Sequence, residues 1–251
     1  MKNFMGKNVL VTGGSRGIGA ATVELFAQLG ANVSFNYYQN KQAAENLGDK
    51  LKELPGKRYT QACDVSDIDQ VKTFINNTIK NLGSIDILIN NAGIWDYGAI
   101  ETMTSENWHR TMKVNLDSVF YFTKYIVQHM RKEKIAGRII HVASTAGQRG
   151  ESFHSHYAAS KGAIISFTKS LATELGPLGI TVNCVAPGWV DTDMSSQALQ
   201  EEGDKILATI PLGRIPTPSE IAGPIVFLAS EWATAITGEI LNVNAGSVLC
   251  G

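Results

Sequence analysis

Thr12-Gly13-Gly14-Ser15-Arg16-Gly17-Ile18-Gly19 is the stretch that decides the fold, because it joins an apolar run to a helical pattern. Residues 8–12 read as a strand, and residues 20–29 read as a helix. Glycines in such a turn let the backbone approach a phosphate, and the helix N-terminus supplies N–H groups and a favourable dipole. A P-loop is excluded, because Ala20 follows Gly19 where that motif has a lysine. The turn therefore predicts a dinucleotide-type phosphate site, although a glycine turn alone is weak evidence.

The same alternation of strand and helix continues along the whole chain. Further strands are expected at 32–36, 59–63, 85–90, 138–142, 180–185 and 239–243. Helices are expected at 41–54, 67–82 with Ser66 as N-cap, 105–131, 155–175 and 219–229. Apolar strands separated by helices indicate a parallel sheet covered on both faces. We therefore predict an α/β fold with a doubly wound parallel sheet of about seven strands, as a single domain over residues 1–251.

Composition excludes several classes of function. Hydrophobic residues make up 44% and charged residues 18% of the chain, which is typical of a globular protein. The formal net charge of −1 gives no field that would favour nucleic acid or an anionic membrane. The apolar runs are too short to span a bilayer, and the N-terminus lacks the apolar core of a signal peptide. The three cysteines, Cys63, Cys184 and Cys250, have no metal-like spacing, so we expect a cytoplasmic protein without a metal site.

Unusual residues gather at one edge of the expected sheet. Besides the glycine turn, Asp64 follows the third strand, Asn90-Asn91-Ala92-Gly93 ends the fourth, Ser144 follows the fifth and Pro187-Gly188 follows the sixth. In doubly wound sheets, ligands bind beyond the carboxyl ends of the strands. The sequence therefore predicts one site at that edge.

A tyrosine and a lysine in the expected helix 155–175 favour proton chemistry at this site. Tyr157 and Lys161 are four residues apart, so they share one helix face. A nearby ammonium favours the phenolate, and we expect Lys161 to lower the pKa of Tyr157. Such a pair can exchange a proton in reversible carbonyl–alcohol chemistry. The spacing also arises by chance, so the pair carries weight only together with the other motifs.

Taken together, these motifs resemble the short-chain dehydrogenase/reductase family. The features that carry the resemblance are the T-G-x-x-x-G-x-G turn, Asn90-Asn91-Ala92-Gly93, Asn115, Ser144, Tyr157-x-x-x-Lys161 and Pro187-Gly188. They occur in the family's order over essentially the whole chain. The 3-oxoacyl-acyl-carrier-protein reductase branch is the most similar, through stretches such as Gly188–Met194 and Thr237-Gly238-Glu239. The resemblance implies a nicotinamide-dependent oxidoreductase that is a homotetramer.

The resemblance also implies roles for individual residues. Tyr157 would protonate the substrate oxygen, Ser144 would orient it, Lys161 would act on Tyr157 and the nicotinamide ribose, and Asn115 would hold a relay water. The residues expected to contact the cofactor are Gly13, Ser15, Arg16, Gly17, Ile18, Gly19, Tyr37, Asp64, Val65, Asn91, Ala92, Gly93, Tyr157, Lys161, Pro187, Gly188, Val190 and Thr192. Asn90 resembles part of the same turn.

Two positions favour NADP(H) over NAD(H). An NAD site usually has an acidic residue at the end of the second strand, where this chain has Tyr37. Arg16 in the glycine turn has the geometry to bind a 2′-phosphate, although it also reads as a solvated loop cation. We expect Asp64 to accept a hydrogen bond from the adenine. NAD(H) remains the alternative cofactor.

The substrate is the least determined part of the assignment. Residues 191–212 are expected to form a lid, and His154 and His156 to shape the mouth of the substrate site. Carrier-protein reductases need basic surface near the pocket, but two positions where the family has basic residues carry Ile135 and Leu178. Nearby Arg131, Lys132 and Lys134 are candidates to replace them. The alternatives are a small free alcohol, a sugar, a cyclic ketone or an acyl-CoA, and, in another class, a non-catalytic nucleotide sensor.

Overall fold

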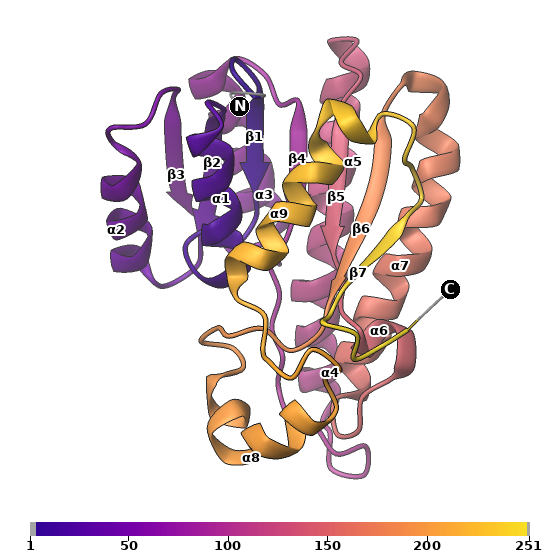
Figure 1. Ribbon diagram of the computed structural model, residues 1–251. Coiled ribbons are helices and arrows are strands. Elements are labelled where there is room, and N and C mark those ends of the chain that lie inside the picture. The colour runs from indigo at the N-terminus through magenta and orange to yellow at the C-terminus, as the bar shows by residue number, and fades with distance from the viewer. Residues whose placement is uncertain (1–3, 250–251) are drawn as a thin grey trace.

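The computed structural model describes residues 4–249, which build one parallel sheet covered by helices on both faces (Figure 1). Residues 1–3 and 250–251, and with them Cys250 and both ends of the expected domain, lie outside the described residues. The strands are β1 (Asn8–Val11), β2 (Asn32–Tyr37), β3 (Arg58–Ala62), β4 (Ile87–Asn90), β5 (Arg138–Val142), β6 (Thr181–Pro187) and β7 (Ile240–Val243). Their order is β3-β2-β1-β4-β5-β6-β7, and every pair is parallel.

The strand order reverses direction beside β1, and this is what creates the site. From β1 the chain moves outward through β2 to β3, and then returns to place β4 on the other side of β1. The connections after β1 and β4 therefore leave the sheet in opposite directions and open a crevice at the carboxyl edge. The doubly wound α/β fold predicted from the sequence is confirmed.

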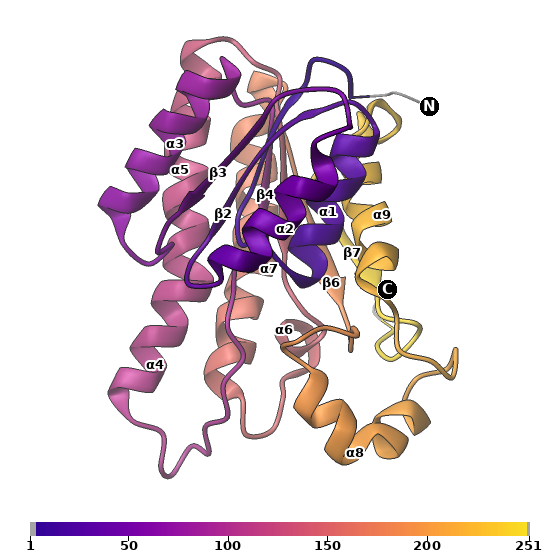
Figure 2. The ribbon, with the colours of Figure 1, turned by 90° about the vertical axis from the view of Figure 1, so that its left-hand side faces the viewer.

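Two helical layers cover the sheet, as Figure 2 shows. One layer contains α1 (Gly17–Gln28), α2 (Lys41–Leu51) and α9 (Pro218–Ala229), and the other contains α3 (Ile68–Leu82), α5 (Ser118–Lys132) and α7 (Ser155–Leu175). Residues of β1, β4 and β5 are buried on both sides, so these strands read as continuous apolar runs. Each layer has its own core, centred on Phe26 and Phe35 in the first and on Phe74 and Phe122 in the second.

The N-terminus of α3 differs from the sequence-based expectation. Helix α3 is capped by Asp67, not Ser66: the Asp67 carboxylate accepts from the backbone N–H groups of Asp69 at 2.9 Å and Gln70 at 3.2 Å. Ser66 instead contacts Asp64 before the helix: its backbone N–H and its hydroxyl both donate to Asp64 Oδ1. A carboxylate stabilises a helix N-terminus more strongly than a hydroxyl because it also carries charge.

The expected helix 105–131 is three consecutive segments. It consists of α4 (Ser105–Met112), a π-helical turn η1 (Lys113–Asp117) and α5. The sequence pattern predicted helix throughout, but a single extra residue in one turn leaves no mark on apolar periodicity. Asn115 lies within the π-helical turn.

Four further elements were not predicted from the sequence. Helices α6 (Ala146–Arg149) and α8 (Ser196–Ala208) lie at the carboxyl edge, after β5 and β6. The 3₁₀ turns η2 (Gly176–Leu178) and η3 (Glu231–Ala233) come before β6 and β7. Figures 1 and 2 place both α4 and α8 below the sheet, and Figure 2 shows them on opposite sides of the molecule. Helix α8 occupies most of the expected lid, residues 191–212, which the sequence indicated only as a polar interrupted segment.

Candidate active site

One cavity of about 630 Å³ opens at the carboxyl edge of the sheet. It is lined by every residue that the sequence predicted for cofactor contact and by Ser144, Tyr157 and Lys161. These residues come from turns after β1, β2, β3, β4, β5 and β6 and from the first turns of α7. The residues predicted to gather at the carboxyl edge of the sheet therefore line one cavity. The cavity is large enough for an extended dinucleotide and a small substrate.

The glycine turn after β1 forms one end of the cavity. Gly13 and Gly17 have φ angles of +63° and +54°, which disfavour other residues. A Cβ on Gly19 would collide with the Gly13 carbonyl oxygen, so the first helical turn of α1 can pack against the strand only with glycine here. The N-terminal N–H groups of α1 are thereby presented to the cavity, as an anionic phosphate requires.

The turn after β4 is locked against the glycine turn. Asn91 donates from Nδ2 to the carbonyl oxygen of Thr12 at 2.9 Å, and the hydroxyl of Thr12 accepts from the backbone N–H groups of Asn91 and Ala92. A Cβ on Gly93 would lie 3.5 Å from Lys161 Nζ and 3.3 Å from Asn115 Oδ1, so a larger residue would crowd both groups. The crevice between β1 and β4 is therefore rigid before any ligand binds.

Asn90 does not belong to this surface, contrary to the expectation from the motif. It is 2% exposed, and its Nδ2 contacts Thr123 Oγ1 at 3.0 Å and His141 Nδ1 at 3.1 Å within the core. Successive side chains of a strand point to opposite faces, and Asn90 is still in β4 while Asn91 is past its end. Through these two contacts Asn90 joins β4 to α5 and β5 within the core.

Ser144, Tyr157 and Lys161 all line this cavity. Ser144 follows β5, and its Oγ accepts from the backbone N–H of Ala146 at 3.1 Å, which fixes the hydroxyl. Lys161 Nζ donates to the carbonyl oxygen of Val142 at 2.8 Å and lies 5.7 Å from the centroid of the Tyr157 ring. Tyr157 and Lys161 are 9% and 4% exposed, so they act in a desolvated environment.

The expected effect of Lys161 on Tyr157 is not found. Burial raises the pKa of Tyr157 to about 12; a hydrogen bond with Ser144 opposes this shift, and the Glu151 charge adds to it. Burial also lowers the pKa of Lys161 to about 8. Both side chains are buried together, and loss of hydration acts against each charged form more strongly than the two groups act on one another.

Asn115 lies behind the cavity wall and does not line it. Its Oδ1 accepts from the backbone N–H of Ile94 at 2.8 Å, and its Nδ2 donates to the Ile94 carbonyl at 3.0 Å and to Ser160 Oγ at 3.1 Å. The side chain thus joins η1, the loop after β4 and α7, which carries Tyr157 and Lys161. Both hydrogens of its amide are used in positioning these elements.

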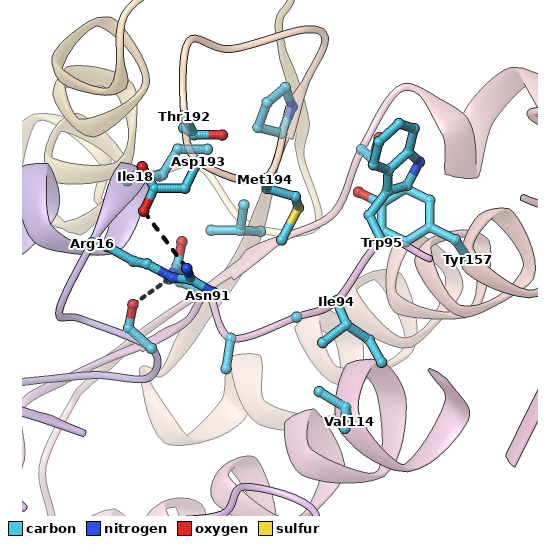
Figure 3. Close-up of a pocket in the computed structure, with 18 of the residues that line it drawn as sticks. Arg16, Ile18, Asn91, Ile94, Trp95, Val114, Tyr157, Thr192, Asp193 and Met194 are labelled. Carbon is cyan, nitrogen blue, oxygen red and sulfur yellow. Dashed lines mark hydrogen bonds and ion pairs between the residues drawn. The ribbon is translucent and has the colours of Figure 1, made fainter. Parts of the chain in front are cut away.

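Arg16 extends from the glycine turn toward the segment after β6. Its Nη1 lies 3.6 Å from Asp193 Oδ2, and both side chains are more than half exposed (Figure 3). An exposed ion pair of this length contributes little by itself, so Arg16 can exchange Asp193 for another anion. Tyr37, at the end of β2, lines the same part of the cavity and has no charge to oppose a phosphate.

Asp64 and Val65 line the cavity beyond the end of β3. Oδ1 of Asp64 is used by Ser66, whereas no hydrogen bond within residues 4–249 occupies Oδ2. Pro187, Gly188, Val190 and Thr192 line the opposite wall, between the end of β6 and α8.

Two tryptophans and a glutamate on the cavity wall were not predicted. Trp95 lies two residues after Gly93, Trp189 directly follows Gly188, and Glu151 follows α6. The four tryptophans looked scattered in the sequence, but these two rings lie 5.7 Å apart edge to face. The sequence did contain a signal for both tryptophans, because each lies within two residues of a motif at the carboxyl edge, Asn90-Asn91-Ala92-Gly93 or Pro187-Gly188.

The two expected mouth histidines do not themselves line the cavity. His154 stacks behind Trp95, with centroids 4.3 Å apart and an interplanar angle of 5°, so it supports the wall. His156 is fully buried, and neither ring nitrogen has a hydrogen-bond partner among the described residues. His154 is the N-cap of α7 with a side chain only 12% exposed, and His156 lies in the first turn of the helix, on its buried side.

The positions discussed for a carrier protein lie away from the cavity. Ile135 precedes β5 and Leu178 precedes β6, so both are at the amino edge of the sheet. Arg131 and Lys132 in the last turn of α5, and Lys134 just after it, lie at the same edge. The expectation that these residues adjoin the pocket of the same chain is therefore wrong. Arg110 and Arg149 are the exposed arginines that line the cavity together with Arg16.

Residues 4–249 contain no group of three or more His, Cys, Asp or Glu side chains arranged to hold a metal ion. Within the same residues, no helix combines the length and apolar character needed to cross a membrane.

Comparisons with known proteins agree on the kind of protein this chain resembles. The model of the family described as enoyl-(acyl carrier protein) reductase matches residues 13–247. Proteins described as 3-oxoacyl-[acyl-carrier-protein] reductase from Vibrio cholerae and Chlamydia trachomatis are 41% and 38% identical to the chain, with 97% of this chain and 98% of each relative covered. The crystal structure of a short-chain dehydrogenase/reductase from Brucella melitensis, titled glucose/ribitol dehydrogenase, has a TM-score of 0.92 and 34% identity, and 99% of each chain is covered.

Proposed function

The chain belongs to the short-chain dehydrogenase/reductase family, and from that premise we propose that it reduces 3-oxoacyl thioesters to 3-hydroxyacyl thioesters with NADPH. The family is one of NAD(P)-dependent oxidoreductases that act on CH–OH groups. The observation that carries the proposal is the meeting of Ser144, Tyr157 and Lys161 in the cavity that the glycine turn also lines. The full-length relatives support the choice of a 3-oxoacyl group.

The residues of the cavity fit a nicotinamide dinucleotide. The positive-φ glycines and the α1 N-terminus accept a pyrophosphate, and Asp64 and Val65 lie where a base would be held. Bound there, the cofactor supplies a hydride to the ketone carbon. Arg16 and the uncharged Tyr37 favour a 2′-phosphate and hence NADP(H), as a proposal beyond the general NAD(P) requirement.

Proton transfer is assigned to this chain's own residues. Ser144 donates a hydrogen bond to the substrate oxygen and holds it near Tyr157. As negative charge develops on that oxygen, Tyr157 gives it the phenolic proton. With a pKa of about 12, Tyr157 is protonated at neutral pH and thus ready for reduction. Lys161, charged below its pKa of about 8, faces the resulting phenolate and offers N–H groups to a ribose.

Two further proposals concern the cellular compartment and the oligomeric state of the protein. We propose a cytoplasmic homotetramer: Cys63 and Cys184 are free and buried, which suits a reducing compartment. Exposed Trp108 and Phe120 on the helices around η1, and Phe227 and Trp232 near α9, suit contacts between subunits.

A substrate panel tests the proposed function. NADPH oxidation would be followed with 3-oxobutanoyl-N-acetylcysteamine, 3-oxobutanoyl-CoA, the carrier-bound form, a 2-enoyl thioester and simple cyclic ketones. We expect turnover of the three 3-oxoacyl substrates and none of the enoyl thioester. Turnover of cyclic ketones or polyols with no 3-oxoacyl activity would overturn the substrate assignment.

The same panel tests the carrier preference. Because the chain has a net charge of −1 and its basic cluster Arg131–Lys134 lies at the far edge, we expect less than about a tenfold advantage of the carrier-bound substrate in kcat/KM. A much larger advantage that collapses with salt would restore a dedicated carrier-docking surface.

A further inference from the structure

A built aromatic and acidic surface lies beside Tyr157 and has no part in the proton transfer described above. Trp95, Trp189 and Glu151 line the cavity together with Tyr157, and in Figure 3 Trp95 and Tyr157 lie on the same side of the cavity. Burial is the main cause of the raised pKa of Tyr157, and the charge of Glu151 on the same cavity wall adds to it. We refer to Trp95, Trp189 and Glu151 as the indole–carboxylate subsite.

The indole of Trp95 is held from three directions. Its Nε1 donates to Glu151 Oε1 at 3.1 Å, the His154 ring stacks on it at 4.3 Å, and Trp189 meets it at 85°. A side chain fixed in this way loses little further freedom when a ligand packs against it. The cavity wall at Trp95 is therefore preorganised to bind a planar apolar group.

Glu151 has unused capacity to accept hydrogen bonds. Oε1 is taken by Trp95 and lies 3.8 Å from His154 Nδ1, whereas no residue within 4–249 donates to Oε2. The side chain is 20% exposed, and its burial raises the pKa of the carboxyl above the ordinary value. A partly desolvated carboxylate oxygen without a donor is stabilised when a ligand brings one.

We propose that the indole–carboxylate subsite selects ketones whose substituent is a ring bearing a hydroxyl group. The ring packs against Trp95 and Trp189, and the ring hydroxyl donates a hydrogen bond to Glu151 Oε2. The same carboxylate repels substituents that carry a negative charge. This inference rests on the proposed function, because it takes Tyr157 as the place where the ketone oxygen is held.

Binding of three matched ring ketones to the enzyme loaded with NADP⁺ tests the proposal. Calorimetry would compare acetophenone, hydroxyacetophenone and acetylbenzoate, with the 3- and 4-substituted isomers of the last two. We expect the better hydroxy isomer to bind about tenfold more tightly than acetophenone, as one hydrogen bond to a charged group implies. Acetylbenzoate should bind at least about tenfold more weakly than acetophenone.

Glu151→Gln is the diagnostic variant. Glutamine keeps an oxygen to accept from Trp95 Nε1 and has nearly the same volume, so the wall stays in place while the charge is lost. Both affinity ratios should then fall to within about twofold of one. Glu174→Gln, the same change on the exposed far part of α7, should leave both ratios as in the wild type.

Each outcome decides the proposal. Equal binding of the three ketones by the wild type, or no measurable binding of any, would overturn it, as would unchanged ratios in Glu151→Gln. The wild-type ratios alone suffice if that variant does not fold. Turnover of 3-oxobutanoyl-N-acetylcysteamine, measured in parallel, reports on the proposed function independently of this binding order.

Discussion

Tyr157 and Lys161 were recognised as a pair from their spacing, but their environment differs from the one that spacing suggested. Each is desolvated, so the phenol is a weaker acid and the ammonium a stronger acid than in water. This arrangement favours a protonated tyrosine and hence the reductive direction near neutral pH. The physical state of the pair follows from burial, which the i, i+4 spacing does not reveal.

Tyr157→Phe removes only the proton donor. We expect kcat to fall by about 10²–10⁴-fold with little change in NADPH affinity. In the wild type, reduction should decline above about pH 8, where Lys161 loses its charge, whereas alcohol oxidation should rise with pH because it requires the phenolate. Initial rates in both directions between pH 6 and 10 test this, and oxidation that is flat with pH would contradict the assignment.

Lys161→Met should inactivate the enzyme but raise its stability. The pKa of Lys161 is lowered from 10.5 to about 8 by burial, so the folded state holds this proton less tightly than the unfolded chain. Burial of the charged lysine therefore lowers the free energy of unfolding. This destabilisation is fully present below pH 8 and disappears as pH rises toward 10.5. We expect a gain of about 1–3 kcal/mol in the free energy of unfolding at pH 7, measured by denaturant titration. A loss of stability would show that the Val142 hydrogen bond outweighs desolvation.

Arg16→Ala should change cofactor preference. The loss of one charge-assisted contact should weaken NADPH binding by about 1–3 kcal/mol, roughly fivefold to 150-fold, and leave NADH nearly unaffected. Dissociation constants for both cofactors measure this directly. Tighter binding of NADH than NADPH by the wild type would refute the preference.

Among the elements, α8 and the segment before it are the least anchored part of the site. Within α8 only Ile206 is buried, and the helix is kinked at Glu202. Thr192, Asp193, Met194 and Ser195 line the cavity immediately before the helix, and the Arg16–Asp193 contact is exposed. A segment with few buried apolar contacts opens easily, which suits a lid.

Hydrogen exchange should detect this lid. We expect NADPH to slow backbone amide exchange across residues 192–208, because a ligand in the cavity gives this segment a surface to pack against. The amides of α9 serve as the internal control and should not change, because one face of this helix, which includes Ile221, Ile225 and Leu228, is buried. Protection that appears equally in both segments would indicate global stabilisation instead.

At the scale of the whole molecule, apolar side chains remain exposed on several helices. Phe120 is 46% and Trp232 is 66% exposed, and they lie on α5 and η3, which flank different strands. Exposed large aromatic residues on a globular chain commonly mark interfaces.

A homotetramer is therefore expected in solution. Light scattering at micromolar concentration should give about four times the chain mass of 27.1 kDa. Phe120→Lys and Trp232→Lys should each lower that mass without unfolding the chain, as monitored by circular dichroism. A monomeric mass for the wild type would contradict the proposal.

The sequence by itself determined the order of the seven strands along the chain, the doubly wound class and the identity of the residues at the carboxyl edge. Strand alternation and turn glycines depend on local backbone geometry, so they leave a local trace. For this reason Gly13, Ser144, Tyr157 and Lys161 were found without coordinates, and the structure brings them to one cavity.

Only the tertiary structure decided the properties that arise when distant segments pack together. These include the burial that shifts the pKa of Tyr157, the inward direction of Asn90, and the split of the helix 105–131 by η1. The neighbourhood of Trp95, Glu151 and Trp189 has the same origin, since these residues are far apart in the sequence and meet only after β4, β5 and β6 align. Desolvation and side-chain contact depend on the whole fold, so no pattern within one segment can specify them.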